Sequence, residues 1–388
     1  MNGKIAVIKF RNILRWIPYP IRKLISLLKF LAGNPGRWPS IFLAGKPEKG
    51  EISVFYGYDH IPNLDEPAHG GIVKFQRMQN LFPNTPRHFN LLYMVSSVYP
   101  PDWAQLLWLA RHKGARLVWN QNGVGYVGWH GPGWERINKP MVKMVHEADY
   151  VFYQSRFCKL SADHFLGERH GPWEILYNAV DTRVFTPTVS DPDLRHLVLL
   201  LGGSQSQYYR LESALQTIAI LAHHRKDVRL LVTGMLDWIL DKEGASRLAQ
   251  RLVKNLDIAD RVEFLGPYTQ AEAPAIFQRA HLLLHTQYND ASPGLVIEAM
   301  ACGLAVVYSK SGGAPELVGE DAGIGIPAPL SWDRYFPPDP EALANAVLRI
   351  AEQRERFAEA ARQRAVELFD LRPWLKRHHE VFEELLCK

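Results

Sequence analysis

The chain has 388 residues, of which 47% are hydrophobic and 22% are charged. This composition is typical of a soluble globular protein, and the length exceeds that of one ordinary domain, so we expect two domains. The three cysteines, Cys158, Cys302 and Cys387, are odd in number and far apart. They argue against a disulfide framework or a zinc site and favour a reducing, cytoplasmic location.

The formal net charge of +5 is concentrated at the N-terminus. Residues 1–37 hold eight Lys and Arg residues and no acid, so the rest of the chain carries −3 and no nucleic-acid partner is expected. Apolar residues from Ile21 to Leu28 fall on one face of a helix that is too short and too charged to span a bilayer or to act as a signal peptide. This arm is expected either to lie on the inner face of a membrane or to pack on the first domain.

Beyond this arm, strand-like runs alternate with helical patterns. The first four strand-like runs lie at 51–62, 89–97, 115–123 and 148–155, and helical patterns such as DWAQLLWLARHKG separate them. This alternation predicts a parallel sheet that is covered by helices on both faces.

A polar stretch with two prolines, residues 186–197, follows and predicts a linker. Its Asp191-Pro192-Asp193 triplet is better interpreted as a turn than as a metal site. A second alternation then runs to a long helix from Pro340 to about Phe369. The pattern predicts an α/β fold of two facing Rossmann-like, doubly wound domains, at residues 38–187 and 188–372, with a cleft between them.

The strongest functional signal lies at residues 285–316. The strand-like HLLLH leads through the loop NDASPG into LVIEAMA, a good helix sequence with Ser292 or Pro293 near its start. A helix that follows a small-residue loop at the end of a parallel strand presents free N–H groups and the positive end of its dipole. The segment therefore predicts a site for a diphosphate.

Two acids and two glycines accompany this helix. Asp290 lies in the loop and Glu298 lies inside the helix, so that one can face a sugar while the other accepts hydrogen bonds from a ribose diol. Gly312-Gly313 offer a second close approach of the backbone. The alternative is an ordinary strand, loop and helix with two solvated acids.

These motifs together resemble the retaining glycosyltransferases of family four. In that family a Glu, seven residues and a second Glu precede A-M-A-x-G-x-P-V and a G-G-x-x-E segment, and Asp290, Glu298, AMACGLAVV and GGAPE stand at those positions here. ADYVFYQSRFCK, LYNAVDTRVF and RVEFLGPYTQ resemble three further family segments. The resemblance covers about residues 50–385.

The resemblance implies a GT-B fold, in which the C-terminal helix at 373–388 returns to the first domain. It implies transfer of a sugar, from a UDP- or GDP-sugar, to a glycan or lipid-linked acceptor with retained configuration, as in cell-surface polysaccharide or glycolipid assembly. GT-B enzymes stabilise the departing diphosphate with backbone amides and basic side chains, so neither a metal ion nor another cofactor is expected.

The resemblance also implies which residues form the site. The base pocket is expected at Val262, Gly266 and Pro267. The donor-binding residues are expected to be Gly70, Gly71, Gly203, Ser204, Arg210, Ser292, Pro293, Gly294, Leu295 and Glu298.

Several positions depart from the family pattern. Ser204 and Arg210 occupy the two places where the family has an Arg and a Lys on the diphosphate, and Asn122 stands where the family has a His that contacts the donor sugar. We therefore expect Asp290, Asn122 and His130 as candidate catalytic residues, with His130 alternatively an ordinary loop histidine. The neighbouring aromatic residues Tyr126, Trp129 and Trp134 are interpreted either as an acceptor surface or as a packed loop, and the histidine pairs His223-His224 and His378-His379 as solvated helix faces.

Three functions are compatible with this pattern. The first is an active glycosyltransferase, and the second is a catalytically silent sugar-nucleotide binding protein or partner subunit, which the departures favour. The third is a sugar-nucleotide epimerase, which lacks a visible acid and base pair in the cleft.

Overall fold

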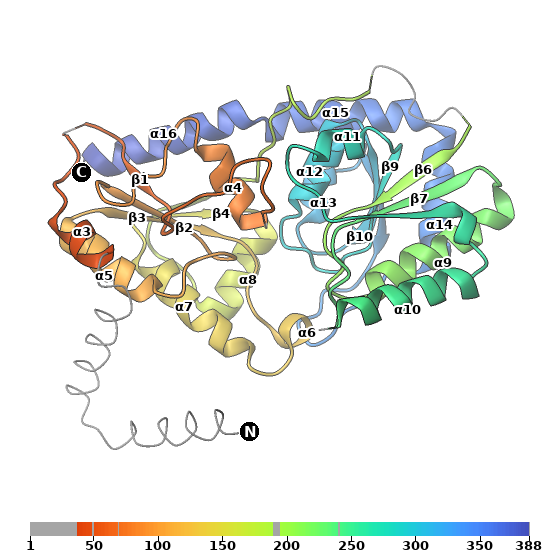
Figure 1. The fold of residues 1–388 in the computed structure, drawn as a ribbon, viewed down its shortest axis with the longest axis horizontal. Coiled ribbons are helices and arrows are strands. Elements are labelled where there is room, and N and C mark those ends of the chain that lie inside the picture. The colour runs from red at the N-terminus through yellow and green to blue at the C-terminus, as the bar shows by residue number, and fades with distance from the viewer. Residues whose placement is uncertain (1–36, 49, 69, 189–194, 240, 388) are drawn as a thin grey trace.

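The computed structural model describes residues 37–387, apart from residues 49, 69, 189–194 and 240. Two parallel sheets of five and six strands lie side by side, and helices cover both faces of each (Figure 1). The predicted architecture of two facing Rossmann-like domains is confirmed. The expectations for residues 1–36 and for Asp191-Pro192-Asp193 fall outside the described residues.

The N-terminal sheet has the order β1-β2-β3-β4-β5. Its helices α4 and α16 cover one face, and α5, α7 and α8 cover the other. The elements before the interdomain linker are α3 (Arg37–Leu43), β1 (Val54–Phe55), α4 (Gly70–Met78), β2 (Leu91–Val95), α5 (Trp103–Lys113), β3 (Arg116–Gln121), α6 (Val127–His130), α7 (Trp134–Glu147), β4 (Tyr150–Tyr153), α8 (Arg156–Leu166) and β5 (Trp173–Ile175).

The direction in which strands are added reverses at β1. A parallel bridge joins Val54 of β1 to Asn84, so the chain crosses through α4 to one side of β1 and then returns to form β2 on the other side. Such a reversal opens a crevice beyond the carboxyl ends of the strands. Helix α4 begins there, at Gly70.

The C-terminal sheet has the order β11-β10-β9-β6-β7-β8 and reverses between β6 and β9. Its elements are β6 (Leu197–Leu201), α9 (Tyr208–His224), β7 (Val228–Thr233), α10 (Lys242–Asn255), the 3₁₀ turn η2 (Ala259–Arg261), β8 (Val262–Gly266), α11 (Ala273–Phe277), β9 (Leu282–His285), α12 (Gly294–Ala301), β10 (Ala305–Lys310), α13 (Ala314–Val318), β11 (Gly323–Pro327), α14 (Pro340–Glu352), α15 (Arg354–Phe369) and α16 (Leu371–Cys387). The predicted helix from Pro340 to Phe369 is two helices, broken at Gln353.

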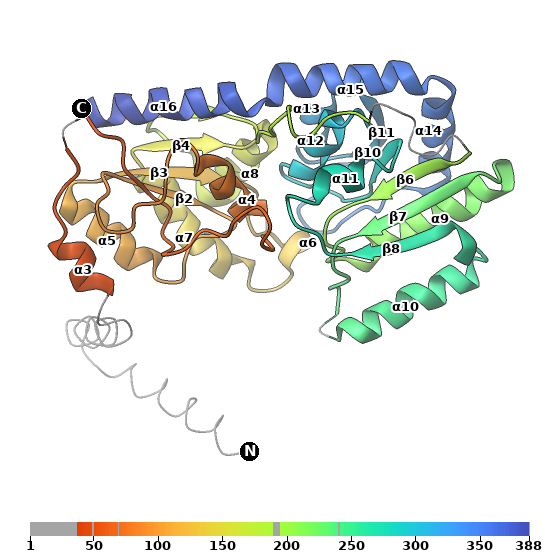
Figure 2. The same ribbon diagram turned by 45° about the horizontal axis from the view of Figure 1, so that its top comes forward.

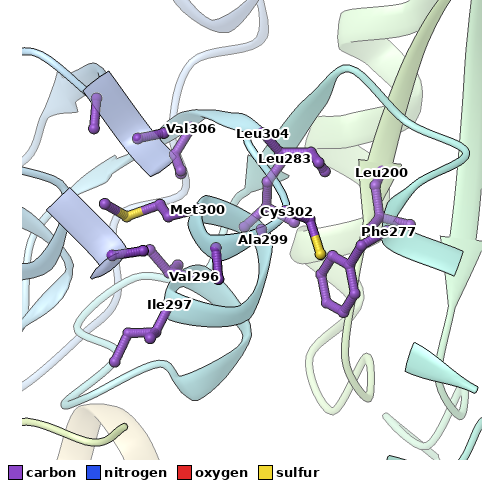
Figure 3. Close-up of a cluster of buried hydrophobic side chains, with 14 of the residues drawn as sticks. Leu200, Phe277, Leu283, Val296, Ile297, Ala299, Met300, Cys302, Leu304 and Val306 are labelled. Carbon is purple, nitrogen blue, oxygen red and sulfur yellow. The ribbon is translucent and has the colours of Figure 1, made fainter. Parts of the chain in front are cut away.

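Helix α12 is buried on almost every side, which explains the small and apolar residues of its EAMAC sequence. Val296, Met300 and Leu304 pack with strand residues of β6, β9 and β10 and with Phe277 of α11 (Figure 3). Ala299 and Ala301 are fully buried, and the carbonyl of Ala301 accepts a hydrogen bond from Arg362 of α15 at 2.7 Å. This packing holds the N-terminus of α12 rigidly at the crevice.

The last two helices run along one side of both domains (Figures 1 and 2). Helix α15 packs on the C-terminal domain, and α16 packs on the N-terminal sheet through Trp374, Val381 and Phe382. Between them the backbone passes the end of the N-terminal domain, where Val180 N–H donates to the Phe369 carbonyl at 2.8 Å. None of the described helices is long and apolar enough to cross a membrane.

His378 of α16 is fully buried, so its predicted placement on a solvated helix face is wrong. Its Nδ1 lies 2.8 Å from the Trp374 carbonyl, which can only accept, so Nε2 accepts from the Tyr93 hydroxyl at 3.0 Å. Burial lowers the pKa of His378 to about 3. The neighbouring His379 is exposed and lies 3.4 Å from Glu383.

Because the folded protein keeps His378 neutral while the unfolded chain protonates its histidine below about pH 6.5, stability is expected to fall as the pH drops from 6.5 towards 3. The loss attributable to this ring approaches about 1.4 kcal/mol per pH unit within that window. His378→Gln should flatten this part of the profile, and His379→Gln should leave it unchanged. Urea unfolding between pH 4 and 7 measures both, and an unchanged slope in His378→Gln would contradict the assignment.

Candidate functional site

A cleft of about 570 Å³ lies between the two domains, where the carboxyl ends of both sheets face each other. The N-terminal domain lines it with the start of α4 and with Asn122 and Gln154, and the C-terminal domain with the loops after β6, β7 and β8 and the start of α12. Trp374 of α16 also reaches the cleft. Ten of the predicted site residues line it: Gly70, Gly71, Asn122, Gly203, Ser204, Pro267, Ser292, Gly294, Leu295 and Glu298.

Two helix N-termini from opposite domains meet at this cleft. Gly70 and Gly71 begin α4, and Gly294 and Leu295 begin α12. The first N–H groups of a helix have no partner within the helix, and each N-terminus carries a partial positive charge, which stabilises an anion by roughly 0.3–1 kcal/mol at an exposed site and up to ~2 kcal/mol at a partly buried one. The arrangement therefore suits a multiply charged anion.

An ion pair crosses the cleft. The Arg77 guanidinium of α4 lies 2.5 Å from Glu298 Oε1 of α12, and both side chains are almost fully buried. Arg77 also donates to Gln270 Oε1 at 3.1 Å and to the Ala179 carbonyl. Burial raises the pKa of Glu298, and the charge and hydrogen bond of Arg77 partly oppose that rise.

A buried polar network extends from His378 of α16, through Tyr93, to the loop between β9 and α12. This loop, residues 286–293, is called the donor loop below because the sequence predicts a donor site there. Asn120 donates to the Tyr93 hydroxyl at 3.0 Å, and its Oδ1 accepts from Lys74 Nζ at 2.7 Å and from Gln154 at 2.6 Å. Burial lowers the pKa of Lys74 well below its usual range. The amide of Asn178 then donates to Gln154 Oε1 at 3.0 Å.

Ser292 ends this network and joins the two domains. Its hydroxyl accepts from Asn178 at 3.1 Å and donates to the Gln154 carbonyl at 3.2 Å, so it is not the N-cap of α12. The N-cap is Pro293, which does not line the cleft. Ser292 thus ties the loop before α12 to the N-terminal domain.

Further contacts hold the domains together beside the cleft. Glu316 of α13 accepts two hydrogen bonds at 2.8 Å from the first N–H groups of α8, and Ser155 donates to the Ala291 carbonyl at 2.7 Å. Trp332 packs its ring on Tyr126 and Phe165 of the N-terminal domain at centroid distances of 5.0 and 5.3 Å.

Arg210 does not face the cleft. Its guanidinium is buried and donates to the carbonyls of Ser204 and Gly202 in its own loop, and burial lowers its pKa. Its two terminal nitrogens thus donate within the loop after β6, and Arg210 is not among the residues that line the cleft. Ser204 itself is exposed and lines the cleft.

Asp290 also lies outside the cleft lining. Its carboxylate oxygen Oδ2 lies 3.3 Å from Nε2 of the buried His285, and its carbonyl accepts from Gly313 N–H at 2.8 Å. The loop thus directs the Asp290 side chain towards the end of β9.

Gly312 and Gly313 allow close packing against the same loop. A Cβ atom on Gly312 would lie 2.3 Å from the Asp290 carbonyl oxygen, and one on Gly313 would lie 2.1 Å from that of Ala291. Gly312 also has a φ of +65°. The two glycines let the turn after β10 pass directly against the donor loop.

His130 is exposed at the end of α6 and does not line the cleft. Its ring contacts Trp129, whereas Tyr126 and Trp134 pack against Phe165. The aromatic residues therefore form a packed loop.

The predicted base pocket is placed only in part. Pro267 lines the cleft, and Gly266 closes β8 beside it, with its carbonyl accepting from Gly234 at 2.8 Å. Val262 begins β8 at the opposite end of the strand and lines a separate hollow of about 440 Å³. A five-residue strand is too long for both of its ends to reach one cleft.

Comparison with known proteins agrees with the motifs and the geometry. Residues 190–364 match the family model described as glycosyl transferases group 1. The matched residues make up most of the C-terminal domain. The resemblance inferred from the motifs is thereby confirmed.

Curated relatives match part of this chain at identities of 28% and 35%. The chain is 28% identical over 150 residues to one polypeptide of human phosphatidylinositol N-acetylglucosaminyltransferase, covering 38% of the chain and 29% of that protein. It is 35% identical over 170 residues to the D-inositol 3-phosphate glycosyltransferase of Mycobacteroides abscessus, covering 41% of the chain and 37% of that protein. The chain thus spans well under half the length of these two relatives.

Solved structures share the two-domain fold at low sequence identity. Anabaena HepE in complex with UDP superposes with a TM-score of 0.63 at 19% identity, covering 76% of this chain and 79% of that one. Sucrose-phosphate synthase from Thermosynechococcus elongatus superposes with a TM-score of 0.62 at 18% identity, covering 81% and 76%. The expected GT-B fold is confirmed.

Several cleft residues were missed from sequence, chiefly Lys74, Arg77, Gln154, Asn178 and Gln270. Lys74 and Arg77 stand three residues apart in the helix that follows Gly70-Gly71, so they share one helix face. That spacing was the available signal. The three amides carried none, because they come from separate loops, two in the N-terminal domain and one in the C-terminal domain, which only the tertiary structure brings to one cleft.

Proposed function

We propose that the protein transfers a sugar from a nucleoside-diphosphate donor to a hydroxyl group with retained configuration. The observation that carries the proposal is the pair of helix N-termini, at Gly70 and Gly294, that converge on one interdomain cleft with Glu298 beside them. The group 1 family match and the UDP bound to HepE support a nucleotide-sugar donor. A UDP-sugar is the first candidate and a GDP-sugar the second.

In this proposal the diphosphate lies between the two N-termini and the ribose diol binds Glu298. As the bond to the sugar breaks, negative charge grows on the leaving diphosphate. Fixed amide dipoles stabilise this charge without reorganising, and the loss of a single donor of this kind typically slows a reaction 10²- to 10³-fold. The chain's own contribution is thus to position the donor and to stabilise the charge.

We propose that no metal ion is required. Among the described residues of the cleft lining, Glu298 is the one carboxylate, and it is paired with Arg77, whereas Mg²⁺ prefers several oxygen ligands. Transfer measured with EDTA and with added Mg²⁺ checks this proposal, and a strict Mg²⁺ requirement would contradict it.

The acceptor in this proposal is a glycan or lipid-linked hydroxyl. Phosphatidylinositol N-acetylglucosaminyltransferase, by its name, acts on a lipid. The eight basic residues in positions 1–37 would bring the chain to an anionic membrane surface. Salt-dependent association with anionic liposomes, lost on deletion of residues 1–37, tests that placement.

A donor screen tests the central proposal. Thermal unfolding is followed with UDP-, GDP- and ADP-sugars, because a ligand that binds only the folded state stabilises it by about 2.7 kcal/mol at one hundred times its Kd. The sugars of one nucleotide should raise the melting temperature. The protein should then hydrolyse that donor or transfer its sugar. No shift with any of the three would overturn the proposal.

A catalytically silent sugar-nucleotide binding protein is the second candidate. The positions of Arg210 and Asp290, both directed away from the cleft, and the serine at position 204 favour it. Binding of a donor without hydrolysis or transfer to any acceptor would support this function over the first.

A further inference from the structure

The C-terminal domain provides no cationic side chain to the cleft lining that the structure describes. Ser204 is exposed in the loop after β6. The Arg210 side chain does not line the cleft, and its two terminal nitrogens donate to carbonyls of its own loop. The cations of the lining are Lys74 and Arg77, both on α4 of the N-terminal domain. Two helix N-termini alone leave most of a diphosphate's charge unbalanced.

Of these two cations, Arg77 is the one placed to meet an anion. Lys74 Nζ is fully buried, donates to Asn120 inside the polar network and has a lowered pKa. Arg77 extends across the cleft, where one terminal nitrogen already binds the Glu298 carboxylate at 2.5 Å. Arginine keeps its charge when buried and offers two parallel donors, which suits a phosphate.

The present partner of Arg77 is the carboxylate that the donor needs. Glu298 is assigned to the ribose diol in the proposed function, yet its Oε1 is bound to Arg77. A donor that binds Glu298 therefore competes with Arg77, and Arg77 then lacks a charged partner in a buried site. An unpaired buried charge is unfavourable by several kcal/mol, so a second anion at that place is favoured.

We propose that Arg77 exchanges Glu298 for the donor's diphosphate, so that the N-terminal domain supplies the cation that position 204 lacks. The inference rests on the proposed function and adds the residue that binds the leaving group. Arg77, the start of α4 and the start of α12 all border the same cleft, so an anion between the two helix starts would lie on the wall from which Arg77 extends. The Arg77–Glu298 pair is then the resting form of the site.

The test separates the diphosphate from the nucleoside. Binding of uridine, UMP and UDP, with the guanosine series in parallel, is measured by calorimetry for the wild type and for Arg77→Ala. We expect Arg77→Ala to weaken the binding of UDP at least tenfold, which corresponds to one lost charge-assisted contact. The affinity for uridine should change by less than about twofold. Arg136→Ala, at an exposed position on α7, is the matched control and should change neither.

Two further variants distinguish a phosphate contact from a structural role. Arg77→Lys keeps the charge and should recover part of the UDP affinity. Ser204→Arg in the Arg77→Ala background introduces a cation at an exposed place on the opposite wall and should restore UDP binding at least severalfold, a rescue that a folding defect would not show.

The outcomes are distinguishable. A wild type that binds no nucleotide of any base overturns the proposed function and this inference with it. If the wild type binds UDP, and the Arg77→Ala variant keeps the same increase in affinity from uridine to UDP, the inference alone is overturned. An equal loss of uridine and UDP without rescue by Ser204→Arg assigns Arg77 to domain packing and also overturns it.

Discussion

Replacing Glu298 with glutamine is expected to lower kcat/KM for the donor about 10- to 100-fold. The amide keeps the shape of the buried side chain but loses the charge-assisted hydrogen bonds to the ribose diol, which contribute about 1.5–3 kcal/mol. Glutamine is preferred to alanine because Glu298 is fully buried against Arg77, and a cavity beside an unpaired guanidinium would destabilise the fold.

The pH dependence provides a second measure of the same variant. Burial raises the pKa of Glu298 above its ordinary value of 4.5, so the wild type should lose donor binding as the pH falls through that raised pKa. Below it the carboxyl is neutral and the diol contact is weakened. The Gln variant should lack this acidic limb, because its side chain does not titrate.

Glu316→Gln is the matched control for domain closure. Glu316 also accepts hydrogen bonds across the domain interface, from the N–H groups of Arg156 and Phe157, but it does not line the cleft. An equal loss in Glu298→Gln and Glu316→Gln would mean that both act by loosening the domains, and donor recognition by Glu298 would then be wrong. Unchanged kinetics in Glu298→Gln would refute the site itself.

Gly312→Ala is expected to destabilise the C-terminal domain by about 2–5 kcal/mol and to weaken donor binding. The added methyl group lies 2.3 Å from the Asp290 carbonyl oxygen, and the residue must keep a φ of +65°. The left-handed backbone contributes about 1–2 kcal/mol and the overpacking about 1–3 kcal/mol. The loop from Asp290 to Gly294 must move to relieve the overlap, and it leads directly into α12.

Two other glycines separate these two causes. Gly313 has an ordinary φ of −89° but would place its Cβ 2.1 Å from the Ala291 carbonyl oxygen, so Gly313→Ala measures the overlap alone. Gly133, with φ +90° and ψ 11°, has no atom within 4 Å of its Cβ position, so Gly133→Ala measures the backbone cost alone. Chemical unfolding and UDP titration of all three variants check the prediction. A Gly312→Ala protein no less stable than Gly133→Ala would contradict it.

The interdomain contacts have a common consequence for the cleft. Glu316, Ser155 and Trp332 hold the two walls from the side, while Arg77 and Glu298 join them across the middle. Under the proposed function, a donor replaces the central pair while the lateral contacts stay in place. The closed arrangement thus pre-organises the cleft before the donor arrives.

Much of the fold was predictable from the sequence alone. The alternation of apolar runs and helical patterns determined two parallel sheets with helices on both faces, because the periods of strand and helix are local properties of the chain. The same is true of the donor loop: Ser292, Gly294 and Glu298 were predicted from a strand, a small-residue turn and a helix that follow one another in sequence. The sequence also showed that Ser204 replaces one of the two cations that the family places on the diphosphate.

Only the tertiary structure decided where individual side chains point and which groups they contact. Arg210, Asp290 and His130 have the right residue types for the site, but the carbonyls after β6, the ring of His285 and the surface of α6 hold them elsewhere. His378, predicted to be solvated, is buried because α16 crosses to a sheet formed much earlier in the chain, where Tyr93 lies 285 residues away in sequence. Arg77 meets Glu298 across 221 residues. Such pairs depend on how segments far apart in the chain pack within a domain and on how the two domains close on each other, and local periodicity carries no information about either.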